Sequence, residues 1–118
     1  MNQLVLPGTA AERKGYQPVV RLNANGALHR VEVSAGQKVE FLVEAEDPDN
    51  ELTLVEMDFQ KDGNFDARQE VHGAIARTRF VHSYDKPGSY VAEAWVSDAT
   101  KTYRGPIQNY AAVLVIVQ

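Results

Sequence analysis

The feature that most constrains the fold is the alternation of apolar and polar residues along several short segments. From Lys38 to Ala45, apolar residues occupy every second position from Val39 onward, and charged residues fill most positions between them. This period of two is typical of a β-strand with one buried face. No segment combines a sustained helical period with helix start and stop signals. The sequence therefore predicts an all-β protein.

Seven segments read as strands, and turn residues such as Asn23 to Gly26 and Ala35 to Gln37 separate several of them. Their spacing of roughly 8–15 residues is typical of a β-sandwich. We therefore expect a seven-stranded, Ig-like antiparallel β-sandwich over residues 17–118, preceded by an N-terminal arm or linker over residues 1–16 that includes a small anchoring strand. The expected strands are 19–22, 29–33, 38–45, 52–59, 74–82, 90–97 and 111–117.

The composition excludes several classes of partner and of chemistry. The 118 residues suit one domain, and the formal net charge of −4 argues against partners with phosphate backbones and against anionic membrane surfaces. The absence of cysteine excludes disulfides, thiolate metal sites and cysteine catalysis. Because no run approaches about 20 apolar residues, we expect no membrane insertion. The first residues do not form a signal peptide, so a signal for export would lie outside this sequence.

Several short motifs follow the strands in a recognisable order. An acidic loop comes first, then an Asp-Phe segment that leads to Asp-Gly, and then a segment with His, Tyr and Pro-Gly before a strand that ends at Asp98. These motifs are Asp47-Pro48-Asp49-Asn50, Met57-Asp58-Phe59, Asp62-Gly63 and His82-Ser83-Tyr84-Asp85-Lys86-Pro87-Gly88-Ser89-Tyr90. The order resembles the PKD domain over about residues 34–118. Met57 stands where that family usually has Trp, and Gln60-Lys61 lengthens the Asp-Phe to Asp-Gly segment.

The resemblance implies a function as well as a fold. It implies a non-catalytic accessory module of a larger extracytoplasmic protein, located in the periplasm or outside the cell. Its partner would be a neighbouring catalytic domain, or a carbohydrate or protein bound by the module. The contact would be between proteins, between domains or with carbohydrate.

The segment from His82 to Tyr90 has a structural interpretation. Pro87 pre-sets the backbone for the first central position of a turn, and Gly88 accepts the positive φ of the second, which predicts a type II turn. Tyr84 and Tyr90 flank this corner, where a tyrosine hydroxyl can bond to nearby backbone. We interpret His82 as a half-buried residue that ties the turn to the preceding strand.

Catalytic motifs are missing from the sequence. It has no Gly-x-Ser-x-Gly elbow, no His-Glu-x-x-His pair and no glycine-rich phosphate loop. Ser83 is adjacent to His82, so the two side chains of a strand point to opposite faces and cannot form a nucleophile–base pair. A small enzyme remains an alternative, and it would require a concave pocket with convergent titratable groups.

Calcium is the one cofactor that the sequence suggests. Oxygen-bearing side chains alternate around a glycine in Asp58-x-Gln60-x-Asp62-Gly63-Asn64-x-Asp66, which imitates the start of a calcium loop. The resemblance implies a second location, the acidic loop with Asp47 and Asp49. A calcium-stabilised adhesive or carbohydrate-binding module is thus an alternative function. The other interpretation is that these aspartates form Asx turns.

A binding surface is the remaining hypothesis. If the alternation of residues 90–97 buries Ala92, then Trp95 faces outward, and the last strand places Leu114 and Ile116 on the side opposite its valines. Apolar residues on both sides of a sheet indicate a second covering layer. That layer is either the N-terminal arm with Leu4, Val5 and Leu6, or a partner. Both interpretations stay open at this point.

Overall fold

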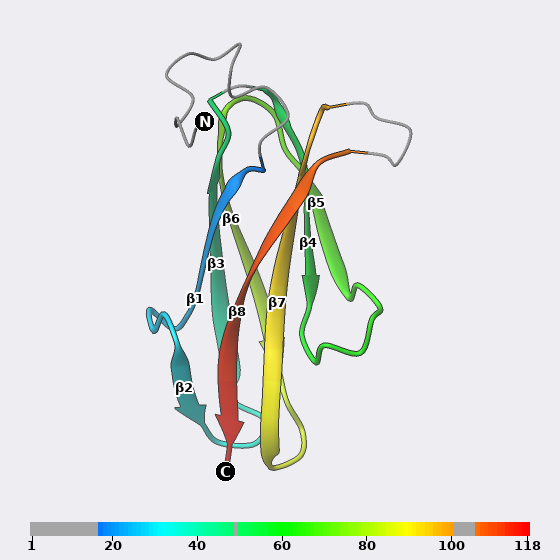
Figure 1. Cartoon of the computed structure of the whole chain (residues 1–118). Coiled ribbons are helices and arrows are strands. Elements are labelled where there is room, and N and C mark those ends of the chain that lie inside the picture. The colour runs from blue at the N-terminus through cyan, green and yellow to red at the C-terminus, as the bar shows by residue number, and fades with distance from the viewer. Residues whose placement is uncertain (1–16, 49, 101–105) are drawn as a thin grey trace, which may run out of the picture.

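The computed structural model describes residues 17–48, 50–100 and 106–118, and its secondary structure consists of strands (Figure 1). The eight strands are β1 (Val19–Ala24), β2 (Arg30–Val33), β3 (Lys38–Glu46), β4 (Leu52–Asp58), β5 (Ala67–Glu70), β6 (Ile75–Ser83), β7 (Gly88–Asp98) and β8 (Gln108–Val117). The described residues therefore confirm the all-β class. Among them, no helix is long and apolar enough to cross a membrane.

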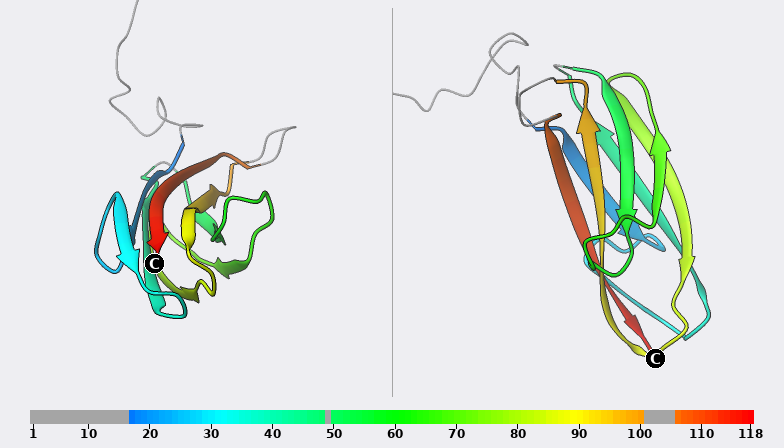
Figure 2. Two further views of the ribbon diagram at one scale, coloured as in Figure 1. Left: turned by 90° about the horizontal axis from the view of Figure 1, so that it is seen from below. Right: turned by 90° about the vertical axis from the view of Figure 1, so that its right-hand side faces the viewer.

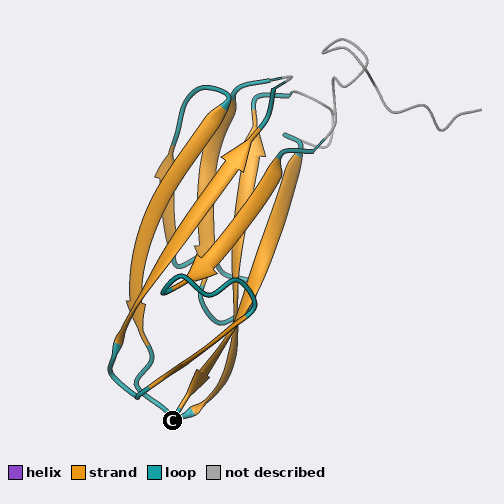
Figure 3. Cartoon of the chain, turned by 90° about the vertical axis from the view of Figure 1, so that its left-hand side faces the viewer, coloured by secondary structure: helices purple, strands orange, loops and turns teal. Residues whose placement is uncertain are grey.

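The strands form two sheets that pack face to face (Figures 2 and 3). One sheet has three strands in the order β1-β3-β6, and the other has five in the order β2-β8-β7-β4-β5. β1 contacts β8 across the sandwich, so the two sheets come together along that side. On the other side, β6 and β5 are the end strands of their sheets in the part of the chain that the structure describes.

The core lies between the sheets and follows the predicted alternation. Val39, Phe41, Val43 and Ala45 of β3 all point inward, and each is at most 6% exposed. The facing sheet contributes buried side chains from β4, β7 and β8 in the same way. These include Val55, Met57, Ala92, Ala94, Val96, Val113, Val115 and Val117. Because strand side chains alternate, fixing these residues inside also fixes which residues face solvent.

The structure corrects the predicted seven-stranded antiparallel sandwich in two respects. β5 is an additional strand, which brings the number in the described residues to eight. Its four residues, Ala-Arg-Gln-Glu, are largely exposed at a sheet end, so they carry no alternation that a sequence pattern could reveal. β2 pairs with β8 in parallel, with Val31 opposite Val115, although the other pairs are antiparallel.

The sandwich is elongated, with principal extents of 50 × 28 × 23 Å. The first described strand begins at one end, where Val19 lies opposite Glu46. The last strand finishes at the other end, where Val117 lies opposite Gly88, as Figure 1 shows. The predicted N-terminal arm, residues 1–16, lies outside the described residues.

Candidate functional site

The solvent side of the five-stranded sheet carries a group of aromatic and apolar residues, here named the aromatic face. It consists of Trp95 and Val91 on β7 and of Tyr110, Leu114 and Ile116 on β8. Trp95 lies directly opposite Tyr110 in the ladder, and their rings stack with centroids 4.6 Å apart at an interplanar angle of 18°. Val91 lies opposite Leu114 further along the same two strands, and the pair of Glu93 and Ala112 lies between them and the stacked rings.

Two nearly buried carboxylates lie beside these rings. Glu93 is 8% exposed and accepts a hydrogen bond from the indole N–H of Trp95 at 3.2 Å. Its other oxygen is 4.0 Å from the ammonium of Lys61. Glu56, opposite Trp95 on β4, is 9% exposed and lies 3.8 Å from the guanidinium of Arg68. Each carboxylate thus has a distant cation and little water around it.

A surface hollow of about 340 Å³ adjoins the aromatic face on its β4 side. Phe65 and Trp95 contribute aromatic rings to it, and Lys61 and Glu93 contribute opposite charges. Phe65 is 46% exposed, which is unusual for so large an apolar side chain. The hollow therefore combines apolar contact area with hydrogen-bond donors and acceptors.

The loop that borders this hollow uses its aspartates to hold its own backbone. Asp58 accepts hydrogen bonds from the backbone N–H groups of Gln60 and Asp62, both at 3.2 Å, and of Gly63 at 2.9 Å. Asp66 accepts the N–H of Phe59 at 2.8 Å. Burial alone would raise the pKa of Asp58, but the three backbone donors outweigh it and the pKa is lowered. These bonds form Asx-type turns, so the aspartates have a structural use in this loop without an ion.

The second predicted calcium location lies at the opposite end of β4. Asp47 directly follows β3 there, and Asp98 is the last residue of β7. Each is only 2% exposed. One oxygen of Asp98 accepts the N–H of Thr100 at 2.9 Å. Its Oδ2 has no hydrogen-bond partner among the described residues. Asp49 is outside the described residues, and the rest contain no group of three or more acidic or histidine side chains arranged for a metal.

A chain of stacked rings connects the loop after β4 to the turn between β6 and β7. The ring of His82 stacks on Phe59 at 4.2 Å and meets Tyr84 edge-on at 4.7 Å. The hydroxyl of Tyr84 donates to the carbonyl of Phe59 at 2.8 Å, and that of Tyr90 donates to the carbonyl of Lys86 at 2.8 Å. Burial lowers the pKa of His82 and raises the pKa of Tyr84. The contacts of these residues bind neighbouring segments together.

The turn itself contains Pro87 and Gly88. Gly88 has a φ of +152°, positive as the sequence suggested but far from the value near +80° of a type II turn. A Cβ at Gly88 would lie 3.7 Å from the ring of Tyr90. The positive φ, rather than lack of space, makes glycine suitable here.

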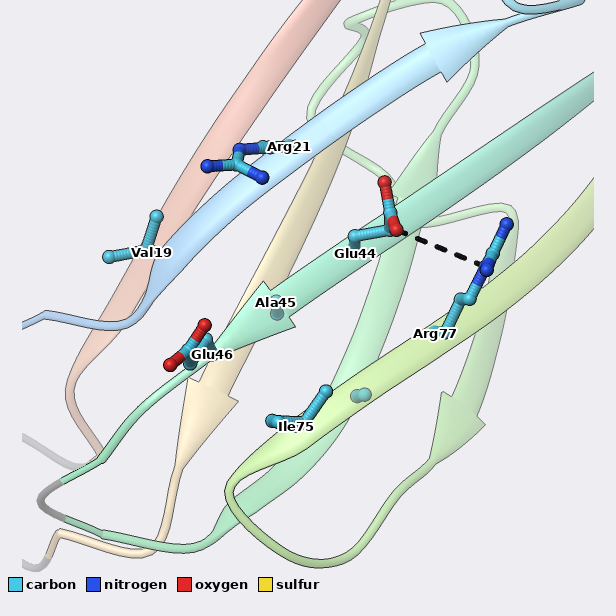
Figure 4. Close-up of a pocket in the computed structure, with 8 residues that line it drawn as sticks. Val19, Arg21, Glu44, Ala45, Glu46, Ile75 and Arg77 are labelled. Atoms are coloured by element: carbon cyan, nitrogen blue, oxygen red, sulfur yellow. Dashed lines mark ion pairs between the residues drawn. The ribbon is translucent and has the colours of Figure 1, made fainter.

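The solvent side of the three-stranded sheet differs from the aromatic face. A hollow of about 310 Å³ lies there among Val19, Arg21, Glu46 and the side chains of the adjoining β6 (Figure 4). Glu44 lies in the middle of a row, with Arg21 opposite it on β1 and Arg77 opposite it on β6. The pairing distance from Arg77 Nε to Glu44 is 3.9 Å. These side chains are exposed and carry alternating charges.

Comparison with solved structures identifies the architecture. The PKD domain of an M14-like peptidase from Thermoplasmatales archaeon SCGC AB-540-F20 superposes with a TM-score of 0.62 at 17% sequence identity, and the match covers 86% of this chain and 92% of that one. This chain has the PKD fold. No protein-family model matches the sequence, and no curated protein matches it either.

The PKD fold explains where the motifs of the sequence lie. Met57 is completely buried in the core between the sheets. Phe59 and Tyr84 meet through the hydrogen bond described above, so the Asp-Phe motif and the His-to-Tyr motif join at one point of the PKD fold. The two motifs thus contribute to packing.

The structure brings together some of the predicted site residues and separates others. Trp95, Leu114 and Ile116 share one face of the PKD fold, on the solvent side of the sheet. Asp58, Asp62 and Asp66 share one loop, but Asp47 lies at the other end of β4. Sequence reasoning missed Tyr110, Glu56 and Phe65. The alternation of β7 places Glu93 on the same outer side as Trp95, whereas Tyr110 requires knowledge of the β7–β8 register.

Proposed function

We propose that this chain is a non-catalytic accessory module of a larger extracytoplasmic protein, and that it docks through its aromatic face against a neighbouring catalytic domain. The PKD domain with the similar fold comes from a peptidase, which supports a catalytic neighbour. A small enzyme remains the competing class, and it would have to use the surface hollows described above.

The observation that carries the proposal is the stacked pair of Trp95 and Tyr110 on the solvent side of a sheet. Antiparallel sheets usually keep such a face polar, so aromatic and apolar side chains gathered on it favour a covering partner. Tryptophan and tyrosine are enriched among residues that dominate the energy of interfaces. Leu114 and Ile116 extend the aromatic face along β8, and the indole N–H already has its hydrogen-bond partner in Glu93.

Hydroxyl-radical footprinting tests this docking, because it reports the solvent access of individual side chains. The rates of modification of Trp95, Tyr110 and Leu114 are compared between the 118-residue chain and the complete parent protein. We expect these rates to fall severalfold in the parent. Ile75 and Val81, exposed on the other sheet, should keep their rates in both proteins.

A matched pair of variants sharpens the test. Leu114→Glu places a charge on the aromatic face, and Val81→Glu places the same charge on the outer side of the three-stranded sheet. In the parent protein, only Leu114→Glu should restore the modification of Trp95 to its rate in the isolated chain. Equal rates for Trp95 in chain and parent would contradict the proposal.

Calcium stabilisation is a second candidate function, favoured by the buried Oδ2 of Asp98. At this end an oxygen of Asp98 is without a hydrogen-bond partner among the described residues, whereas both oxygens of Asp58 in the loop after β4 accept backbone N–H groups. Asp47 and Asp98 would be ligands, together with Asp49. A bound ion would supply positive charge to carboxylates that are otherwise costly to bury.

Thermal unfolding of the chelator-treated protein with and without calcium tests this candidate. A site with a dissociation constant of about 10 μM adds roughly 2.7 kcal/mol at about 1 mM calcium. The rise in melting temperature should disappear in Asp98→Asn or Asp47→Asn and persist in Asp62→Asn. If no rise occurs, or if Asp62→Asn abolishes it, the site at this end is ruled out.

A further inference from the structure

The outer edge of β6, on the sheet opposite the aromatic face, has no neighbouring strand among the described residues. β6 runs from Ile75 to Ser83 and ends the three-stranded sheet in the described part of the chain. Its nine residues, Ile-Ala-Arg-Thr-Arg-Phe-Val-His-Ser, include neither proline nor glycine. A long end strand of this kind presents a row of backbone groups to which another strand can bind.

The inward side of β6 shows that the core is thinly covered at this edge. Phe80 lies opposite Phe41, and Thr78 lies opposite Val43. Phe41 and Val43 are at most 1% exposed, whereas Phe80 and Thr78 are only partly buried. A strand added beside β6 would therefore find apolar surface under its inward side chains, as β3 finds on its own side.

The outward side of β6 carries positive charge. The ion pair of Arg77 with Glu44 uses Nε, and the two terminal nitrogens of the guanidinium have no ion-pair partner among the described residues (Figure 4). Arg79 uses one terminal nitrogen for Glu40 at 2.9 Å. A guanidinium has five N–H donors, so each arginine can pair with a further carboxylate.

The same charges argue against a second copy of β6 as the occupant. Antiparallel pairing centred on Arg79 would place the two copies of that residue opposite each other. Pairing centred on Thr78 would place Arg77 opposite Arg79. Like charges directly opposite one another destabilise a ladder.

We infer that the open edge of β6 binds an extended segment of a partner protein whose acidic and apolar residues alternate. Its carboxylates would pair with Arg77 and Arg79, and its apolar side chains would cover Phe80. β3 is an internal example of this pattern, because its outward Glu40 and Glu44 pair with these arginines while its inward residues pack on the core. This inference does not depend on the aromatic face.

A labelled peptide that copies β3, Lys-Val-Glu-Phe-Leu-Val-Glu-Ala-Glu, is the probe. Binding to the complete chain is followed by fluorescence anisotropy, and we expect saturation with a dissociation constant below about 1 mM. The same peptide with its glutamates replaced by lysine should bind about tenfold more weakly. In amide exchange, alternate residues of β6 should become protected, since only the N–H groups directed away from β3 are available.

Arg77→Glu and Arg21→Glu form a matched pair of variants, because both arginines lie directly opposite Glu44 and both changes alter the net charge equally. Arg77→Glu should weaken the acidic peptide about tenfold and strengthen the lysine peptide. Arg21→Glu, on the far side of β3, should leave both affinities within about twofold. Equal losses in the two variants, protection of another strand, or no saturable binding would each overturn the inference.

Discussion

The two outer surfaces of this sandwich arise from the same alternating pattern, but their glutamates differ in solvent exposure. On the five-stranded sheet, the side chains of Glu56 and Glu93 are only 12% and 11% exposed. On the three-stranded sheet, those of Glu40 and Glu44 are 55% and 44% exposed. The difference arises from the rings of Trp95 and Tyr110 and from the loop after β4, which displace water from one surface.

An outward-facing position in a strand is therefore not necessarily exposed to solvent. A carboxylate in water loses little when its partner is removed, whereas one that is shielded depends on its hydrogen bonds. Substitutions on the five-stranded sheet should therefore cost more stability than equivalent substitutions on the three-stranded sheet.

The largest effect should come from Asp58→Ala, which removes the acceptor of three backbone N–H groups in a part-buried loop. We expect a loss of about 2 to 4 kcal/mol in the free energy of unfolding, measured by urea denaturation. Glu44→Ala, the counterpart on the other sheet, should cost less than about 0.5 kcal/mol. Similar losses in both variants would refute the comparison.

The loss of stability at acidic pH provides a second test of Asp58. Because the folded state lowers the pKa of Asp58, its contribution is present above the pKa of the unfolded state and is lost as pH falls through the folded pKa. Asp58→Asn should therefore show less acid destabilisation than the parent chain.

The stacked pair should give the next largest effect. Trp95→Ala should cost about 1 to 3 kcal/mol, and a double-mutant cycle with Tyr110→Ala should yield a coupling of about 0.5 to 1.5 kcal/mol. Val81→Ala, at an exposed position of the three-stranded sheet, should stay within about 0.5 kcal/mol. A coupling near zero would mean that the two rings contribute independently.

A smaller effect should appear at His82, which joins the two regions because its ring in β6 stacks under Phe59 of the loop. Burial lowers the pKa of His82, and the carboxylates of Asp66 and Asp85 partly oppose this. The unfolded state then binds the proton more readily, so the contribution of neutral His82 to stability is complete above about pH 6.5 and falls as pH decreases from there toward the folded pKa.

His82→Phe keeps a ring in the stack without the titrating group. Urea midpoints measured between about pH 8 and pH 5 should decline less in this variant than in the parent chain. An identical decline in both would assign the pH dependence to other groups.

The smallest effect should come from Arg79→Ala, which breaks an exposed ion pair with Glu40. A loss of about 0.5 kcal/mol at low ionic strength, disappearing at about 1 M salt, is expected from screening. A loss that persists in salt would show that Arg79 contributes through packing of its aliphatic stem.

The sequence allowed most of this architecture to be predicted, because alternation reports directly on burial. It placed the core residues of β3 and β7 correctly and assigned Trp95 to the outer side. It could not reveal β5, whose exposed residues have no apolar face, nor the parallel pairing of β2 with β8, since alternation carries no information on strand direction. The partners of Trp95 depend on register, which distant residues decide.

For the aspartates too, the sequence predicts some features and not others. The spacing from Asp58 to Asp66 suggested an ion-binding loop, and the structure shows each of these carboxylates engaged by backbone N–H groups of the same loop. Local spacing cannot distinguish these uses, because both place oxygen atoms around a glycine turn. The sequence identified Asp98 only as the end of a strand, and its burial depends on packing around the end of β7.

The opposite placement of the first and last described strands has a mechanical consequence. A pull applied at Val19 and Val117 acts along the length of the sandwich, nearly parallel to the strands (Figure 1). Hydrogen bonds between strands lie across that direction, so β1 against β3 and β8 against β2 and β7 would be loaded in shear, with many bonds sharing the force at once. Joined through these two points, the domain would transmit tension as a stiff rod about 50 Å long instead of unzipping one bond at a time.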